Sequence, residues 1–225
     1  MKKAIFKTIG AIVVACASSS VFATVILDSS IVGGQDGTNC TNLLAGAGTA
    51  CANRAMITKS GGGYTGIGIT GGRTNGEIDI DETLTVAFSA EQVIASLTFG
   101  VLFDGPEFGD WNEVAQVTAD GVDWTLTIDT ATTGTWASGA TSWGVTALSA
   151  AESGSGGVWQ VLNPFGVTSV NTLAFTALEA TRCGQGNTCT NQSDYSLVEI
   201  VTVPEPGSIA LLVLGLAGLG FARRR

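Results

Sequence analysis

Short runs of alternating apolar and polar residues, separated by glycines, constrain the fold of this chain most. In the clearest run, residues 77–88, the apolar residues Ile80, Leu84 and Val86 occupy positions of the same parity. A two-residue repeat places such side chains on one face of a β-strand, so we expect a continuous strand here. Shorter runs of the same kind predict strands at residues 24–31, 64–70, 93–103, 114–119, 124–129, 143–148, 158–162, 171–177 and 195–201.

About ten short strands predict a single all-β domain, and we expect a jelly-roll-like β-sandwich of two sheets. Two segments look like hairpin connections between these strands. Asp120-Gly121 is typical of a tight turn, because glycine adopts the backbone conformation that such turns need. We predict the other connection at residues 89–93.

The N-terminal 23 residues have the order of a secretory signal peptide. Lys2, Lys3 and Lys7 provide positive charge, residues 9–17 are apolar, and small residues lead to Ala23. The apolar run is far shorter than the ~20 residues of a membrane-spanning helix. We therefore expect signal peptidase to remove residues 1–23 and leave Thr24 as the mature N-terminus.

A second cleavage site is an alternative. The sequence before Cys16 is similar to a lipoprotein box, in which the cysteine becomes the lipidated first residue of the mature chain. The apolar run before Cys16 is very short for that pathway, and the segment up to Ala23 would then have no role.

The C-terminal end combines a proline motif, an apolar run and a basic cluster. Pro204-Glu205-Pro206 is followed by the uncharged residues 209–222 and then by Arg223-Arg224-Arg225. As a helix, residues 207–222 would extend ~24 Å, slightly less than the ~30 Å hydrocarbon core of a membrane. Terminal arginines favour the cytoplasm, so we expect a short membrane helix with the main domain outside. A buried C-terminal helix is the alternative.

This order of motif, apolar helix and arginines resembles the PEP-CTERM sorting signal of Gram-negative bacteria. The resemblance covers residues 203–225 and implies recognition of Pro204-Glu205-Pro206 by a membrane-embedded exosortase, with Arg223, Arg224 and Arg225 as the cytoplasmic stop. It also implies an inner-membrane precursor that is later displayed on the cell surface or outer membrane, or released into the extracellular matrix. An association with exopolysaccharide and biofilm comes from this resemblance alone. The chain then has a signal peptide at 1–23, a β domain at 24–203 and a sorting tail at 204–225.

The β domain is strongly acidic once the two targeting ends are set aside. Residues 24–203 contain four of the ten basic residues and 18 of the 19 acidic residues. Such a surface repels nucleic acid and other polyanions, and favours cations or neutral sugars.

Four cysteines remain after removal of the signal peptide, in an oxidising compartment. They form two close pairs, Cys40 with Cys51 and Cys183 with Cys189, and we expect a local disulfide in each. A zinc site is the alternative, but the chain has no histidine and the spacings differ from those of paired zinc-binding motifs.

The chain offers little for catalysis. Without histidine it cannot form a Ser-His-Asp or Cys-His site. Two carboxylates could still hydrolyse a glycoside, yet no pair stands out among the many acids. We expect no enzymatic activity and no resident cofactor, with a secreted glycoside hydrolase as an alternative.

Two groups of acidic residues have the oxygen-rich composition of cation ligands. Asp104, Glu107, Asp110 and Glu113 lie in one glycine-containing stretch and could bind calcium, although they lack the spacing of an EF-hand; a solvated loop is the alternative. For the acids of the 77–88 strand we expect the solvent-facing side of an amphipathic strand.

Five tryptophans fall between residues 111 and 159, and their contexts differ. Trp124 and Trp159 lie in alternating apolar runs, so we expect them in the core. Trp111, Trp136 and Trp143 lie among glycine, serine and threonine, where exposed indoles could stack on sugars. The leading hypothesis is thus a non-enzymatic surface or matrix protein, and the main alternative is a jelly-roll carbohydrate-binding module, with or without calcium.

Overall fold

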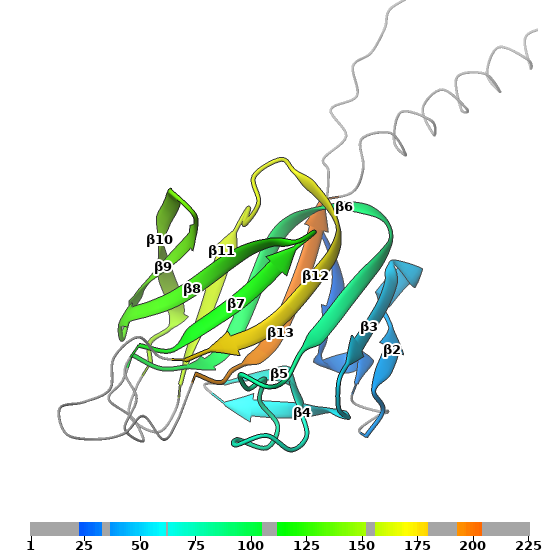
Figure 1. The fold of residues 1–225 in the computed structure, drawn as a ribbon, viewed down its shortest axis with the longest axis horizontal. Helices are drawn as coiled ribbons and strands as arrows, with labels where there is room; N and C mark the ends of the chain where they lie inside the picture. Colours follow the sequence, from blue (N-terminus) through cyan, green and yellow to red (C-terminus); the bar gives the residue numbers. More distant parts are fainter. Residues whose placement is uncertain are drawn as a thin grey trace, which may run out of the picture.

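The computed structural model describes residues 23–32, 37–61, 63–104, 112–151, 156–179 and 193–203. In these residues the chain is all-β, as predicted, and thirteen strands belong to one hydrogen-bonded sheet (Figure 1). Two short 3-10 helices, η1 (Ser29–Ile31) and η2 (Leu44–Gly46), lie among the first strands. The strands are β1 (Thr24–Asp28), β2 (Cys40–Asn42), β3 (Gly48–Ala52), β4 (Met56–Gly61), β5 (Tyr64–Ile69), β6 (Leu84–Leu102), β7 (Val114–Ala119), β8 (Val122–Thr130), β9 (Thr133–Ser138), β10 (Thr141–Ser149), β11 (Gly157–Leu162), β12 (Ser169–Leu178) and β13 (Ser196–Val203).

The sheet closes on itself. Its strand order includes β11-β10-β9-β8-β7-β12-β6, and β11 also pairs with β6, which joins the two ends of this series into a barrel. β13, β5 and β4 extend the sheet beyond β6, β1 pairs with β13, and β3 joins β2 to β6. The structure does not confirm the two separate sheets of a jelly-roll sandwich, because hydrogen bonds connect all strands.

β6 is the long strand on which this closure depends. Its first half pairs with β12 and β3, and its second half pairs with β11 and β13. The predicted connection at residues 89–93 lies inside β6 and is wrong as a turn. The pairing with β12 is irregular there instead. Thr172 of β12 pairs with Ala87, but Val170, two residues away, pairs with Gln92, so β6 has extra residues at this point. The chain bulges there, and Figure 1 shows β6 curving over one end of the domain rather than running straight.

The predicted strand at residues 77–88 is correct only in its second half. Leu84 and Val86 are buried on one face of β6, whereas Ile78 makes only an isolated bridge to Tyr195. Between them, residues 80 and 81 form a turn. The large apolar residues before and after this turn all fall at even-numbered positions, so the sequence looks like one uninterrupted strand.

The predicted hairpin at Asp120-Gly121 is present between β7 and β8. Both residues have positive φ, 45° and 85°, as a tight turn requires. The Asp120 carboxylate accepts hydrogen bonds from the backbone N–H groups of Asn171 and Thr172 at 2.9 and 2.8 Å. These bonds lower the pKa of Asp120 and hold the turn against the start of β12.

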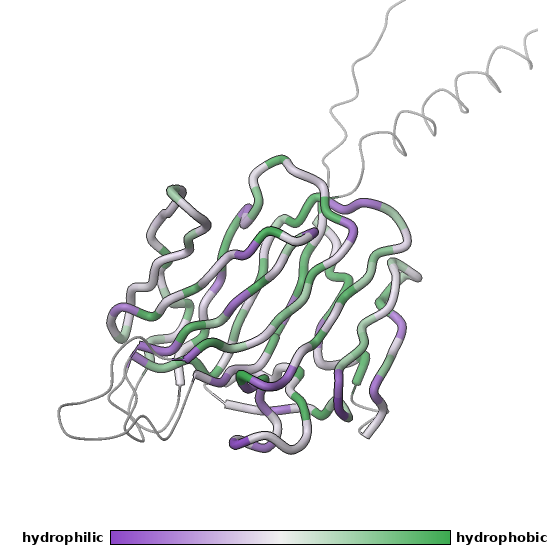
Figure 2. Tube along the Cα trace, viewed as in Figure 1, coloured by the Kyte–Doolittle hydropathy of each residue, from purple (hydrophilic) through white to green (hydrophobic). Residues whose placement is uncertain are grey.

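Large aromatic residues fill the centre of the domain. Apolar segments recur along many of the strands (Figure 2). Phe99 on β6 contacts Tyr195 edge-on, with ring centroids 5.6 Å apart, and lies 6.3 Å from Trp136. The buried indole N–H groups have partners: Trp136 donates to Pro164 O at 3.0 Å and Trp159 to Leu102 O at 3.2 Å. The core therefore buries its aromatic rings without leaving these donors unsatisfied.

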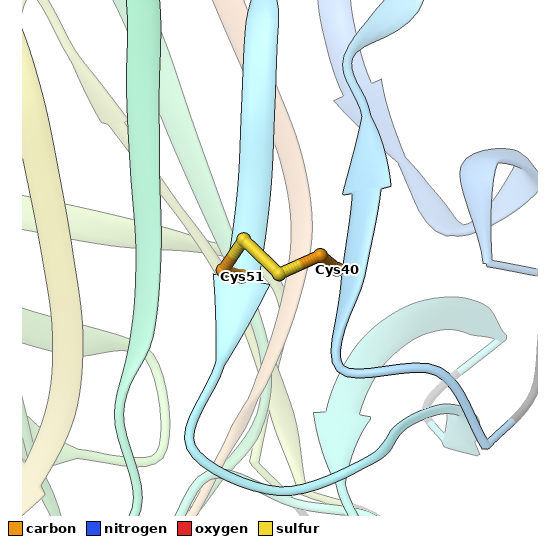
Figure 3. The surroundings of a disulfide bond; sticks show 2 residues. All are labelled: Cys40 and Cys51. Carbon is orange, nitrogen blue, oxygen red and sulfur yellow. A yellow bond between two sulfur atoms is a disulfide. The ribbon is translucent and has the colours of Figure 1, made fainter.

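Cys40 and Cys51 form a disulfide, which confirms the first of the two predicted pairs (Figure 3). They face each other across the β2–β3 ladder, with Cα atoms 4.1 Å apart. Because β3 pairs with β6, the bond ties the three-residue strand β2 to the rest of the sheet. Cys183 and Cys189 lie outside the described residues.

The chain enters and leaves this domain at one end, which we call the terminal pole. Thr24 of β1 pairs with Thr202 of β13, next to the last described residue, Val203. The β11–β12 turn lies at the same pole, because Ser96 of β6 pairs with Leu162 on one side and Val201 on the other. The predicted signal peptide and tail helix lie outside the described residues. No helix within the described ranges is long and apolar enough to cross a membrane.

We expect non-reducing peptide mapping of the exported protein to show a Cys40–Cys51 link. Cys51→Ala should lower the free energy of unfolding by up to about 3 kcal/mol, because the open loop gains freedom in the unfolded chain. The double variant Cys40→Ala/Cys51→Ala is the control and should lose the same amount in denaturant titrations. A link from Cys40 to Cys183 or Cys189 would contradict the hairpin pairing.

Candidate functional site

An aromatic pocket opens at the mouth of the barrel, between the β9–β10 hairpin and the β11–β12 turn. Trp124 on β8 and Trp143 on β10 contribute indoles from neighbouring parts of the sheet, and Phe165 contributes its ring from the turn. The cavity has a volume of about 500 Å³. Its lining residues are Trp124, Thr141, Trp143, Leu162, Asn163, Phe165 and Gly166.

Packing against the core holds the pocket aromatics in place. Trp124 stacks on the fully buried Trp136, with planes 14° apart and centroids separated by 5.8 Å. Phe165 meets Trp124 edge-on at 5.7 Å, and the Trp143 ring lies 5.8 Å from Trp124 at an angle of 59°. The half-buried Trp124 therefore joins the pocket to the core, and Trp143 forms a second aromatic wall.

The β11–β12 turn that carries Phe165 is fixed by backbone hydrogen bonds. Asn163 N–H donates to Ala95 O of β6 at 2.8 Å, and Gly166 N–H donates to Asn163 O at 3.1 Å. Asn163 and Gly166 both have positive φ, 49° and 64°, which allows the chain to reverse within a few residues. The Trp136 indole bond to Pro164 O adds a link from the core.

The structure corrects the predicted sugar-stacking platform. Trp136 lies in β9 with 0% exposure, so it cannot contact a ligand, and that part of the prediction is wrong. β9 was missed because Trp136 is the only large apolar residue in Thr133–Ser138. Trp143 does line an open pocket, and its neighbour there is Trp124, which we expected in the core. Trp159 is buried as predicted, and Trp111 lies outside the described residues.

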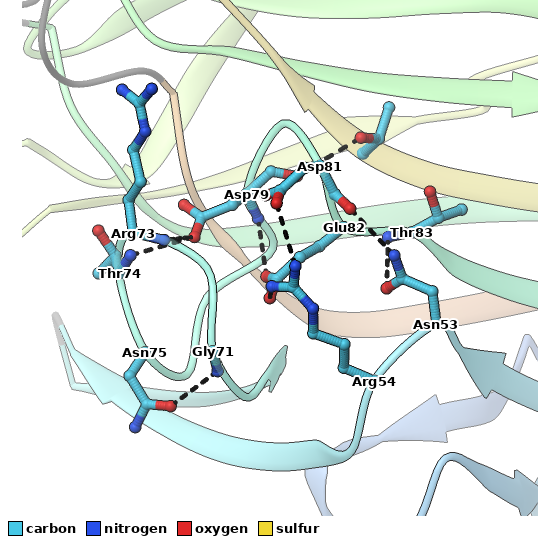
Figure 4. Close-up of polar contacts among 11 residues, drawn as sticks. Asn53, Arg54, Gly71, Arg73, Thr74, Asn75, Asp79, Asp81, Glu82 and Thr83 are labelled. Atoms are coloured by element: carbon cyan, nitrogen blue, oxygen red, sulfur yellow. Dashed lines mark hydrogen bonds and ion pairs between the residues drawn. The ribbon is translucent and has the colours of Figure 1, made fainter.

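A second group of polar residues surrounds the loop between β5 and β6, which we call the carboxylate cluster: Glu77, Asp79, Glu82 and Asp194 with their cationic partners Arg54 and Lys59 (Figure 4 shows the part around Asp79 and Glu82). The four acids are each 5% exposed or less. Glu77 and Asp79 were expected on a solvent-facing strand side. That prediction is wrong, because their segment turns inward rather than continuing β6.

Backbone donors and one arginine satisfy Asp79 and Glu82. The Asp79 carboxylate accepts the N–H groups of Arg73 at 2.5 Å and Thr74 at 3.0 Å. Glu82 accepts Asp79 N–H at 3.2 Å and pairs with Arg54 at 2.9 Å. Burial raises the pKa of both carboxyls, and the hydrogen bonds oppose this.

Gly72 is required beside this pair of acids. Its φ is +64°, and a Cβ atom there would lie 2.0 Å from Asp79 Oδ2 and 3.0 Å from Glu82 Oε1. The absence of a side chain lets the loop backbone pass close to both carboxylates.

Glu77 and Asp194 link the loop to the start of the last strand. Lys59 of β4 pairs with Glu77 at 2.6 Å, and Thr74 Oγ1 donates to Asp194 Oδ2 at 2.7 Å. Burial, together with the hydrogen bond to Glu77, raises the pKa of Asp194 to about 8. At neutral pH Asp194 thus mostly keeps its proton and donates a hydrogen bond to Glu77, so the two acids do not repel each other.

The carboxylate cluster therefore connects β4, the loop between β5 and β6, and the residues just before β13. Across the described residues, no group of three or more histidine, cysteine, aspartate or glutamate side chains is arranged to hold a metal ion. Of the predicted calcium ligands, Asp104 and Glu113 are described, and the Glu113 carboxylate accepts Phe103 N–H at 2.6 Å. Glu107 and Asp110 lie outside the described residues, so that site stays a prediction.

A family model for the PEP-CTERM protein-sorting motif matches residues 202–225. The chain is thus a protein with a PEP-CTERM sorting motif, which indicates export, processing by an exosortase and sorting to the cell envelope. No curated protein and no solved structure matches the chain.

The raised pKa of Asp194 predicts that stability falls as the pH rises. Between about pH 4, where the unfolded aspartate releases its proton, and about pH 8, the folded state retains a proton that the unfolded state has lost. The free energy of unfolding should then decrease by up to about 1.4 kcal/mol per pH unit in this window, and be constant outside it as far as Asp194 is concerned.

Urea titrations at several pH values between 4.5 and 8 test this prediction. Asp194→Asn should flatten the slope, leaving the smaller part due to Asp79, Glu82 and Glu199, whose pKa values are also raised by burial. Glu179→Gln, at an exposed position, is the matched control and should keep the wild-type slope. An unchanged slope in Asp194→Asn would show that this carboxyl is ionised in the folded protein.

Proposed function

We propose that this protein is a non-enzymatic component of the cell surface or extracellular matrix, associated with exopolysaccharide in biofilm. Signal peptidase removes residues 1–23, the C-terminal helix holds the precursor in the inner membrane, and an exosortase cuts near Pro204-Glu205-Pro206. The mature domain is then displayed or released outside the cell. The observation that carries the proposal is the PEP-CTERM motif at residues 202–225.

The position of the last strand supports this division of the chain. The β13 ladder runs to Val203, which pairs with Val93 of β6, and Pro204 follows directly. Proline lacks a backbone donor and fixes φ, so two prolines at this point favour an extended segment that a protease can bind. A domain that ends at Val203 loses none of its described contacts when the tail is cut.

The chemistry of the candidate site supports a binding role over hydrolysis. The chain has no histidine, and the seven residues that line the aromatic pocket include no carboxylate. Glycoside hydrolysis needs two carboxyl groups across the scissile bond. The buried acids of the carboxylate cluster are instead bonded to backbone donors, Arg54 and Lys59.

The sorting assignment predicts distinct failures for the parts of the tail. Replacing Pro204, Glu205 and Pro206 with alanine should give uncleaved precursor in the inner membrane, heavier by about the mass of the tail. Replacing the three terminal arginines with neutral residues removes the charge that favours the cytoplasm, so the tail should lose its orientation. Cell fractionation with mass spectrometry measures both results.

Ser208→Ala is the matched control for these changes, because it lies between the motif and the apolar run and alters neither. It should be processed like the wild type. A triple-alanine variant that is also processed and displayed like the wild type would refute the sorting assignment.

A further inference from the structure

We propose that the aromatic pocket at the barrel mouth binds a neutral pyranose ring of a polysaccharide, with Trp143 and Trp124 as stacking surfaces. The inference rests on the proposed function, since it names the ligand class through which the domain associates with exopolysaccharide. Its evidence, however, is the geometry of the pocket and not the sorting motif.

The pocket has the size and the mixed polarity of a small-ligand site. Its volume of about 500 Å³ falls within the range of about 300–1,000 Å³ that is usual for such sites, and barrel mouths are among their common positions. Two indoles inclined at 59° offer apolar surface to a ring with apolar C–H faces.

Polar groups at the edge of the pocket match the hydroxyl groups of a sugar. Thr141 contributes a hydroxyl, which donates and accepts, and Asn163 contributes an amide with both functions. Within the described parts of the chain, neither side chain has a hydrogen-bond partner of its own. Both are therefore available to a ligand without breaking a bond of the fold.

The charge distribution selects a neutral ligand. No lining residue carries a charge, so an anionic sugar would meet no cation in the pocket. Arg54 and Lys59 are engaged in ion pairs with the carboxylate cluster. The acidic domain as a whole repels anionic polysaccharide and anionic lipid.

The pocket is built before any ligand arrives. Trp124 is stacked on buried Trp136, and the turn with Phe165 is held by the Trp136 bond to Pro164 O and the Asn163 bond to Ala95 O. A preformed aromatic site loses little conformational entropy on binding. That favours recognition of a single ring over the ordering of a long peptide.

The test is titration of the purified exported protein with neutral oligosaccharides. We would use cello-, manno- and xylo-oligosaccharides, with an oligogalacturonate as the anionic comparison, and follow tryptophan fluorescence and calorimetry. We expect saturable binding of at least one neutral oligosaccharide and none of the oligogalacturonate. Trp143→Ala should weaken that binding about tenfold or more, because it removes one stacking surface.

Three variants make the result specific. Thr141→Val keeps the β-branched shape but removes the exposed hydroxyl, and should weaken binding several-fold with no change in melting temperature, even if Trp143→Ala proves unstable. Trp143→Phe should restore part of the affinity. Tyr64→Ala removes an exposed aromatic ring that does not line the pocket and should bind like the wild type.

Absence of binding by all neutral oligosaccharides at millimolar concentration overturns the inference, as does binding that Trp143→Ala and Thr141→Val leave unchanged. Self-association or binding to lipid vesicles that depends on Trp143, without sugar binding, assigns the pocket to another partner and also overturns it. The titration uses isolated protein, so its failure is separable from failure of the sorting assignment, which is read from processing in cells.

Discussion

The pairing of β6 with β11 is the contact on which the rest of the structure depends. It joins the first and last strands of the series from β11 to β6 and so removes two sheet edges that would otherwise be open to other chains. The same half of β6 also pairs with β13, so Phe99 lies between Trp159 and Leu197 in the two ladders. The turn that carries Phe165 is also bonded to this strand, through the Asn163 N–H and Ala95 O.

The sequence predicts strands well where alternation is local and complete. Residues 114–119 were predicted with the bounds of β7, and Asp120-Gly121 was predicted as the following turn. Prediction from alternation fails where a strand consists mostly of small residues, as in β9. It also fails where a turn keeps the apolar residues at alternate positions, as at residues 80–81. Closure into a barrel could not be predicted, because it depends on β6 pairing with two strands on each side, and alternation does not report partners.

The candidate site shows the same limit for side chains. The sequence neighbours of Trp124 and Trp136 do not indicate how deeply each is buried. Trp124 lies in an apolar run but is only half-buried, at the pocket, whereas Trp136 lies among threonines and glycine but is fully buried. Trp124 stacks on Trp136 and covers it, and the register of β8 against β9 brings the two indoles together. The carboxylate cluster was missed for a related reason, since burial of Glu77 depends on Lys59 from another strand.

Because Thr24 pairs with Thr202, the N-terminal and C-terminal sides of the domain both lie at the terminal pole. An anchor on either side of the domain would therefore hold it at the terminal pole. The end of the domain next to the anchor is the same in both cases. The β11–β12 turn would be nearest to the supporting layer. The loop between β5 and β6, bound near the opposite end of β13, would then point away from that layer.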